Sequence, residues 1–374
     1  MTTDLAGPNA RVERGVLLAL LADEGRTAVG ANLVCSPAMV RFGLAVLATG
    51  ARGATAAALD AFLGVDADAA AAMVADDLAA LGLLNDGAAL EPDLVAVAAA
   101  LWARVPIYAR WRERLPAVGV GQLGVDDPDA WAAEATGGRI DRLAVSSGPE
   151  VLAVLTLAAR LRATWWRPFS PAETVDGTFA GVDRPVPFMR QRSRLHQVWR
   201  AGDVEAVAVR YGSPFVHPWG GLMLVVGAAG NDPVEATAAV LDLVEHDPRP
   251  HTEVDLSLPR FRIDRRGDAA IDLRPALTAC GLDVLFDDRC DLGGISPEPL
   301  KLSEALSQAI IEVDEEGTTA AATLELAMVA GGGPPVTEPE LVSVVVDRPF
   351  AFLVRLGERG PILFGGWVQD PTAS

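Results

Sequence analysis

Residues that could carry out catalysis or bind a metal ion are few in this chain and lie far apart. His246 and His251 are the closest pair of histidines, and a spacing of five residues does not place them on one helical face. The sequence contains no Gly-x-Ser-x-Gly elbow, no Ser-x-x-Lys and no His-Glu-x-x-His, and its only lysine, Lys301, follows a leucine rather than a glycine-rich phosphate loop. We therefore expect a protein that is not an enzyme and that uses no cofactor or metal ion.

One glycine-rich motif matches a nucleotide-binding pattern in spelling. Residues 119–124 read Gly-Val-Gly-Gln-Leu-Gly, which is the glycine spacing of dinucleotide-binding turns. In such turns the N-terminus of the next helix holds the pyrophosphate, but here Asp126, Asp127 and Pro128 follow the glycines. Two carboxylates would repel the phosphates, so we interpret the match as coincidence.

The segment Ile311–Thr323 is the most informative part of the chain, because two interpretations of it predict opposite structures. In the first it leads into a surface helix: Thr318 is an N-cap, the alanines and the residues up to Met328 favour a helix, and Gly331 ends it. In the second it is an exposed segment that can become a strand. Local evidence alone leaves both open.

The strand interpretation has its own pattern. A period of two places Leu324, Leu326 and Met328 on one face and Glu325 on the other, so that the first face could be buried and the second could face water. The residues that precede them, 318–322, are all small. Small side chains are what a segment needs at its leading end if it is to slide between two strands of a formed sheet.

Short motifs along the chain decide between these interpretations. Residues 315–323, Glu-Glu-Gly-Thr-Thr-Ala-Ala-Ala-Thr, resemble the hinge of the serpin family. Other motifs follow that family's order, and they are Asn32–Pro37, Leu47–Thr55, Leu59–Gly64, Trp165–Phe169, Val186–Met189, Leu258–Phe261, Asp291–Ser296, Asp347–Arg355 and Pro361–Pro371. The resemblance covers about residues 12–371 and is to a bacterial-type member of the family.

The resemblance implies an α+β serpin fold, in which helices surround three β-sheets and a reactive-centre loop is exposed. It also implies a serine protease inhibitor that works as a trap: a target protease attacks the loop and forms an acyl-enzyme, and the freed loop inserts into the central sheet and distorts the protease. The alternative is a non-inhibitory serpin that acts as a binding protein.

The resemblance also implies roles for particular residues. The loop spans about residues 315–343. Its hinge comprises Glu315, Glu316, Gly317, Thr318, Thr319, Ala320, Ala321, Ala322 and Thr323. Counting forward from Gly317 places the scissile region at Met328, Val329, Ala330, Gly331 and Gly332, whereas counting back from Pro349 places it near Glu338. No lysine or arginine occurs between Glu312 and Arg348, which favours elastase-like or subtilisin-like targets over trypsin-like ones.

Another group of residues corresponds to the region that lets the central sheet open. Asn32 and Ser36 match a polar network that the family places beneath the central strands, and Ser307 lies at a matching position. Two further matching positions, Met39 and Leu157, are apolar here. Trp165 corresponds to a tryptophan at the top of the sheet, where the loop enters.

Composition bounds the architecture. With 374 residues, 50% of them hydrophobic, and no charged or Gly/Ser-rich linker, we expect a single domain over residues 1–374. Strand-like runs at 151–159, 222–226 and 342–346 lie among alanine-rich segments without regular strand–helix alternation, which indicates an α+β fold. We expect helices at the alanine-rich tracts 67–72 and 96–100, and a first helix at 16–21.

The net charge limits the possible partners, and the targeting signals limit the possible location. The net charge of -19 disfavours nucleic acid, heparin-like polyanions and acidic membranes, and we interpret the arginines between 190 and 200 as a solvated surface. We find no membrane-spanning run and no signal peptide, so we expect a soluble, cytoplasmic monomer, with an extracellular protein as the alternative. The three cysteines predict no disulfide framework, although a Cys280–Cys290 bridge is conceivable.

Overall fold

The structure is a computed structural model. It describes residues 8–27, 32–86, 95–115, 118–135, 138, 140–143, 151–161, 163–212, 222–318, 338–357 and 360–373. All structural statements below concern these residues.

A central sheet runs along the molecule, with the strand order β12-β14-β4-β2-β3 and a short strand, β13, that also pairs with β14. Its two middle strands, β14 and β4, are parallel, in register from Glu304 opposite Val154 to Ile310 opposite Arg160. The strands are β2 (Val95–Ala103), β3 (Gly119–Gln122), β4 (Ala153–Leu161), β12 (Phe261–Arg265), β13 (Ile271–Asp272) and β14 (Glu304–Val313).

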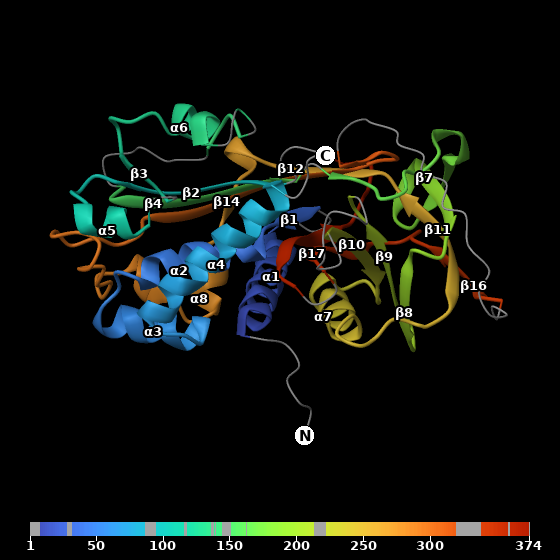
Figure 1. Ribbon diagram of the computed structural model, residues 1–374, viewed down its shortest axis with the longest axis horizontal. Coiled ribbons are helices and arrows are strands. Elements are labelled where there is room, and N and C mark those ends of the chain that lie inside the picture. The colour runs from blue at the N-terminus through green and yellow to red at the C-terminus, as the bar shows by residue number, and fades with distance from the viewer. Residues whose placement is uncertain are drawn as a thin grey trace, which may run out of the picture.

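Helices cover the two faces of this sheet unequally. Figure 1 shows a group of helices below the sheet and the short helix α6 above it. The lower group comprises α1 (Pro8–Thr27), α2 (Pro37–Ala48), α3 (Gly53–Leu63), α4 (Ala67–Asp86) and α8 (Arg274–Ala279). Helix α6 spans Pro128–Ala135, and α5 (Ala109–Arg114) lies at one end of the sheet.

Two further sheets build the other end of the molecule. One has the order β1-β18-β17-β10-β9-β8 and packs against α7 (Pro233–Leu243); the other has the order β16-β11-β7-β6. The strands of the first are β1 (Leu33–Cys35), β8 (Gln197–Ala201), β9 (Val204–Arg210), β10 (Leu222–Ala228), β17 (Phe350–Leu356) and β18 (Ile362–Val368). Those of the second are β6 (Val175–Phe179), β7 (Val182–Ser193), β11 (Thr252–Pro259) and β16 (Glu340–Val345).

Short elements complete the fold. Strand β5 (Ala163–Thr164) follows β4 after one residue, and it pairs with β15 (Gly317–Thr318). Three turns of 3-10 helix lie at Pro171–Glu173, Gly267–Ala269 and Asp283–Phe286. The predicted α+β class with three sheets is confirmed.

Buried side chains form two clusters, one on each face of the central sheet. The larger cluster joins the five lower helices to all three sheets. The smaller one lies beneath α6 and contains Trp102, Leu143, Val154 and Ala158, with Leu306 partly buried against it. Alternate residues of β4 therefore face different clusters, as expected for a strand that is buried on both sides.

Several predicted elements are confirmed, and one is wrong. The first helix, the helix at 67–72 and the strand at 222–226 lie within α1, α4 and β10, and the strands at 151–159 and 342–346 overlap β4 and β16. The tract Ala96–Ala100, predicted as a helix, belongs to strand β2. Strand β4 pairs with the whole of it and β3 with its end. Alanine's helix preference is worth less than about 1 kcal/mol per residue, so these ladders override it.

The remaining sequence interpretations of this region can also be compared with the structure. Residues 119–122 form β3, and a side chain at Gly121 would collide with the indole of Trp102, which explains that glycine by packing rather than by nucleotide binding. Cys280 and Cys290 are free thiols, so the conceivable bridge is absent. Within the described residues, no helix is both long and apolar enough to cross a membrane.

Candidate functional site at the end of the central sheet

The chain reverses direction where β14 ends, and we call residues 314–317 the hinge turn. The carboxylate of Asp314 accepts hydrogen bonds from the backbone N–H groups of Glu316 (2.9 Å) and Gly317 (3.1 Å). After the turn, β15 runs antiparallel to β5, with Gly317 opposite Thr164 and Thr318 opposite Ala163. The first residues of the predicted loop are therefore already paired, as a strand, beyond the end of β4.

Gly317 is the residue that makes this turn possible. Its φ of 136° lies in the region that side chains disfavour. A Cβ atom there would lie 2.2 Å from the Ala163 carbonyl oxygen and 2.6 Å from the Thr164 Cα. The close approach of two backbones therefore requires glycine at this position.

Trp165 holds the hinge turn from the side of β5. Its indole Nε1 donates a hydrogen bond to the Asp314 carbonyl oxygen (2.7 Å), and its backbone N–H donates to that of Glu316 (2.9 Å). The indole ring stacks on Tyr211 with the ring centroids 4.2 Å apart. These contacts place Trp165 beside the residues at which the predicted loop begins.

Glu315 anchors the turn through its side chain, which is only 7% exposed. Arg260 donates to its Oε1 through Nε (2.8 Å) and through a second guanidinium nitrogen, and the Thr174 hydroxyl donates to the same oxygen. Burial acts to raise the pKa of Glu315, but these hydrogen bonds outweigh burial and lower that pKa below its usual value. The carboxylate is thus ionised, and three hydrogen bonds hold one of its oxygens.

A buried histidine, His196, is linked to the hinge turn through Phe169. The His196 ring stacks on Phe169 at 6.5 Å between centroids, and the backbone N–H of Phe169 donates to the Glu315 carbonyl oxygen (2.8 Å). His196 is only 4% exposed, and its Nε2 has no hydrogen-bond partner among the described residues. Burial, assisted by the positive charge of Arg167, lowers the pKa of His196 to about 4.

The contact line between β4 and β14, which we call the seam, leads away from the hinge turn. Leu157 and Ser307 face each other across it, and both are buried. Beneath it lies α2, on which Met39 is also buried. The inner side of the seam is therefore mostly apolar.

The predicted sheet-opening residues do not form one network. Trp165 and Ser307 lie at the hinge turn and at the seam. Ser36 caps α2, accepting a hydrogen bond from the Met39 backbone N–H (3.3 Å). Asn32 lies elsewhere: its side chain bonds four backbone groups, those of Gln369, Asp370 (two) and Ala373. The interpretation of Asn32 as part of a network beneath the central strands is therefore wrong, because it fastens the C-terminal residues.

The other predicted site residues divide between described and undescribed parts of the chain. Glu315, Glu316, Gly317 and Thr318 belong to the hinge turn and β15. Residues 319–323 of the hinge and the predicted scissile region at 328–332 lie outside the described residues. Glu338, the other scissile candidate, is exposed just before β16. Arg260 and Thr174 were not among the predicted site residues, although the motif Leu258–Phe261 contains Arg260.

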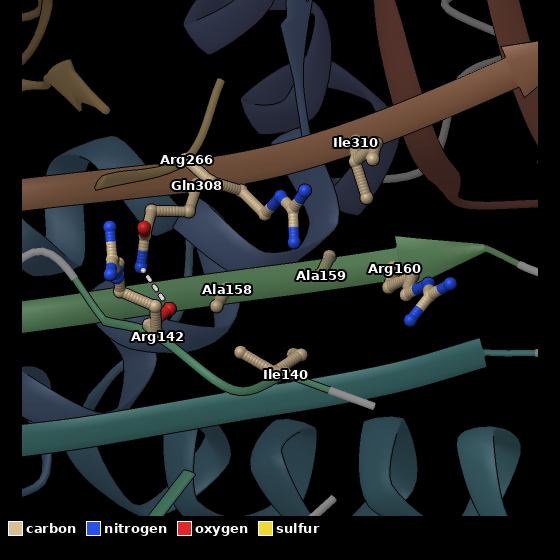
Figure 2. A pocket seen from close by; sticks show the side chains of 8 residues that line it. All are labelled: Ile140, Arg142, Ala158, Ala159, Arg160, Arg266, Gln308 and Ile310. Atoms are coloured by element: carbon tan, nitrogen blue, oxygen red, sulfur yellow. Dashed lines mark hydrogen bonds between the residues drawn. The ribbon is translucent and has the colours of Figure 1, made fainter. Parts of the chain in front are cut away.

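The outer side of the seam carries a small cavity (Figure 2). It is lined by Ile140, Arg142, Ala158, Ala159, Arg160, Arg266, Gln308 and Ile310. Gln308 closes it from β14: its amide nitrogen donates to the Arg142 carbonyl oxygen (3.5 Å), and its oxygen accepts from the Gly267 N–H (2.8 Å). Arg266 pairs with Asp264 at 2.7 Å. The cavity holds about one water molecule, which is too little for a cofactor.

Comparisons with known proteins agree on one family. The family model "Serpin (serine protease inhibitor)" matches residues 17–371. Putative serpin-Z6A of Oryza sativa subsp. japonica is 29% identical over 94% of this chain and 97% of its own length. Iripin-8 of Ixodes ricinus is 30% identical over 67% of this chain and 62% of its own length. A protein named putative non-inhibitory serpin-10, also from Oryza sativa subsp. japonica, is 28% identical over 91% of this chain and 94% of its own length.

Solved structures show the same fold. The Arabidopsis protein AtSerpin1, in what is described as its native stressed conformation, superimposes with a TM-score of 0.78 at 21% identity, covering all of both chains. Serpin48 of Tenebrio molitor superimposes with a TM-score of 0.76 at 21% identity, covering 98% of each chain.

Proposed function

The chain belongs to the serpin family, and from that premise we propose that it inhibits serine proteases by inserting its cleaved loop into the seam between β4 and β14. The observation that carries this proposal is the antiparallel pairing of β15 with β5. Because β5 continues β4, the loop's first two residues already run in the direction that insertion needs. The single domain would thus act as an inhibitor and not as an enzyme.

The β15–β5 register can be carried further along β4. Leu161 and Ala163 both pack in the larger core cluster, so the alternation of faces continues from β4 into β5. In that register Ala320 would lie opposite Leu161, and Leu324 would lie opposite Leu157. Residues paired in this way point to the same side of a sheet.

In this register, the inward side chains of the loop and those of β4 are both apolar. The inward row of the inserted loop would be Ala320, Ala322, Leu324, Leu326 and Met328, and its partners on β4 are Leu161, Ala159, Leu157, Leu155 and Ala153. Apolar side chains would meet an apolar row, including the apolar seam at Leu157 and Met39. Burial would contribute roughly 1.5–3 kcal/mol for each large side chain, and each new strand hydrogen bond roughly 0.5–1.5 kcal/mol.

The chemistry of the trap belongs to the protease. Its serine Oγ attacks the scissile carbonyl carbon, the peptide bond to the next residue breaks, and the released amine takes a proton while an ester joins the loop to the enzyme. Insertion then carries the ester and the protease along the sheet. Inhibition results if the protease is distorted before water hydrolyses the ester.

We propose targets that cleave after small or medium apolar residues, since residues 313–347 contain no lysine or arginine. Counting from Gly317 places the bond within 328–332, and counting back from Pro349 places it near Glu338. A second candidate function is a non-inhibitory binding protein. One relative carries a non-inhibitory name, and a long segment separates the hinge from β16.

The test is incubation of the protein, in slight molar excess, with elastase, subtilisin and trypsin. Denaturing electrophoresis and the intact mass of the released C-terminal peptide are then measured. We expect a complex with elastase or subtilisin that survives boiling, and a released peptide that begins between Val329 and Pro334. Clean cleavage with fully active protease would overturn the inhibitor proposal for these enzymes and favour the binding protein.

A further inference from the structure

The amino-terminal ends of β4 and β14 are joined by contacts that extend beyond their ladder. The last pair of the ladder is Glu304 opposite Val154. One residue further, the backbone N–H of Ser303 donates to the Ala153 carbonyl oxygen (2.8 Å), and the Ser303 hydroxyl accepts from the backbone N–H of Leu152 (2.9 Å). We call these two hydrogen bonds the seam-end contact. They close the seam at the end opposite to the hinge turn.

Ser303 is fixed to the part of the sheet that contains β14. Arg274, the first residue of α8, donates to the Ser303 carbonyl oxygen, and its guanidinium lies over the Phe286 ring, 4.9 Å from the centroid. The backbone N–H of Leu273, just before α8, donates to the Ala305 carbonyl oxygen (2.8 Å). Ser303 is therefore positioned together with β14 and α8.

Leu152 is fixed to the other part of the sheet. Arg104, directly after β2, donates from its backbone N–H to the Leu152 carbonyl oxygen (3.0 Å) and from its Nε to the Val151 carbonyl oxygen (2.8 Å). Strand β4 pairs with β2 over its whole length. The seam-end contact therefore connects two parts of the sheet, one built on β2 and β4 and the other on β14 and α8.

A strand inserted along the whole seam is incompatible with this contact. Neighbouring strands lie about 4.8 Å apart, so a strand between β4 and β14 would separate them to about 10 Å. The register of β15 shows that the chain is long enough to reach this end. Thr318 lies opposite Ala163, Ala153 lies ten residues before Ala163, and residues 319–339 separate β15 from β16. Complete insertion therefore has to break the seam-end contact.

The two kinds of hydrogen bond across the seam differ in what happens to them on insertion. The ladder bonds between β4 and β14 join backbone groups, and an inserted strand offers new backbone partners to both strands. The Ser303 hydroxyl instead holds its partner through a short side chain, which cannot reach Leu152 across an inserted strand. Loss of this bond is therefore specific to opening of the seam at its end.

We infer that Ser303 is a positioning residue that holds this end of the seam closed, so that a strand entering from the hinge turn is inserted completely only after the Ser303–Leu152 hydrogen bond breaks. The inference rests on the proposed function, since it concerns the same insertion. It assigns to Ser303 a role in the intact protein alone, because the bond is absent once the seam is filled.

The experiment measures thermal midpoints of the full chain before and after one nick in the loop by a catalytic amount of subtilisin. Ser303→Ala removes the acceptor and Ser303→Thr keeps it. Ser296→Ala is the matched control, since the Ser296 hydroxyl also accepts a backbone N–H, that of Glu298 (3.1 Å), within its own turn. We expect Ser303→Ala to lower the intact midpoint by about 1–3 °C and to leave the nicked midpoint unchanged. Ser303→Thr should restore the intact midpoint, and Ser296→Ala should lower both midpoints equally.

Hydrogen exchange in the intact protein provides a second measurement. Exchange of the Leu152 amide should become at least about tenfold faster in Ser303→Ala and stay within about twofold of the wild type in Ser296→Ala. An unchanged rate in Ser303→Ala would overturn the inference.

The outcomes separate the inference from the proposed function. If nicking leaves the wild-type midpoint unchanged, insertion itself is overturned, and the role of Ser303 with it. If nicking raises the wild-type midpoint but Ser303→Ala lowers the intact and nicked midpoints equally, only the role of Ser303 in insertion is overturned, because a purely structural bond would persist in both forms.

Discussion

At the scale of single residues, two buried titratable side chains lie at the end of the central sheet, and one is ionised while the other is neutral. Glu315 is ionised and bound by Arg260 and Thr174, whereas His196, behind Phe169, is neutral. Arg260 and Glu315 lie 55 positions apart. No local pattern could predict their pairing. The hinge prediction rests on a local pattern, small residues next to a glycine, and only its first residues, 315–318, lie in the described part of the chain.

His196 predicts a dependence of stability on pH. Its pKa is about 4 in the folded protein, against about 6.5 in an unfolded chain. As the pH falls from 6.5 to 4, the unfolded chain binds a proton that the folded protein does not, so stability falls by up to about 1.4 kcal/mol per pH unit. His196→Phe keeps an aromatic ring against Phe169 and removes the titration. We expect a flatter curve of thermal midpoint against pH over this range.

The exposed His246 offers the control for this prediction. His246→Gln tests whether the effect is specific to the buried histidine. Parallel curves for the wild type and His196→Phe between pH 6.5 and 4 would show that His196 does not titrate as its burial implies.

At the scale of elements, the sequence predicted the helices and strands whose type follows from the local residue pattern. It failed for segments whose structure depends on pairing with distant residues. Helix α4 and strands β4, β10 and β16 lie at predicted positions, because their residue patterns are local. Strand β2 was predicted as a helix, since alanine's preference is visible in the sequence but its ladders to β4 and β3 are not. Asn32 was misplaced for a similar reason, because its partners lie more than 330 residues away.

The register between β15 and β5 predicts that a negative charge has opposite effects at two adjacent loop positions, 320 and 321. Ala320→Glu would direct a carboxylate inward at Leu161, into the larger core cluster, whereas Ala321→Glu would direct it outward beside Arg160. Burial of an unpaired charge should block insertion, so Ala320→Glu should be cleaved as a substrate. We expect its ratio of inhibitor consumed to protease inactivated to rise at least about tenfold, which corresponds to about 1.4 kcal/mol between the competing paths.

Ala321→Glu is the matched control for that variant, since it adds the same charge at a neighbouring position. Its ratio should remain within about twofold of the wild type, a difference of about 0.4 kcal/mol. Equal loss in both variants would mean that the loop does not follow the register of β15. The ratio is measured by titrating a fixed amount of elastase or subtilisin and assaying the residual activity.

At the scale of the whole molecule, the fold holds two parallel strands side by side in the middle of a sheet that has apolar layers on both faces. An antiparallel strand between them would form backbone hydrogen bonds with both strands and add apolar contacts. Antiparallel pairing is slightly more stable per residue than parallel pairing. If the loop inserts as proposed, the intact protein is a kinetically trapped state, and the seam should also accept a strand from outside.

A synthetic peptide with the sequence of residues 318–329, incubated with the intact protein, should therefore occupy the seam. Once it does, the protein's own loop has no place to insert, so the protein should become a substrate and its thermal midpoint should rise. Both changes can be followed together, by the residual activity of added elastase and by thermal unfolding after the free peptide is removed.

The control is the same peptide with Ala320→Glu. It should neither make the protein a substrate nor raise its thermal midpoint, because its carboxylate would face Leu161. If both peptides raise the midpoint equally, the stabilisation does not come from a strand in this register; if neither binds while the protein still forms complexes that survive boiling, the seam opens only after cleavage of the loop.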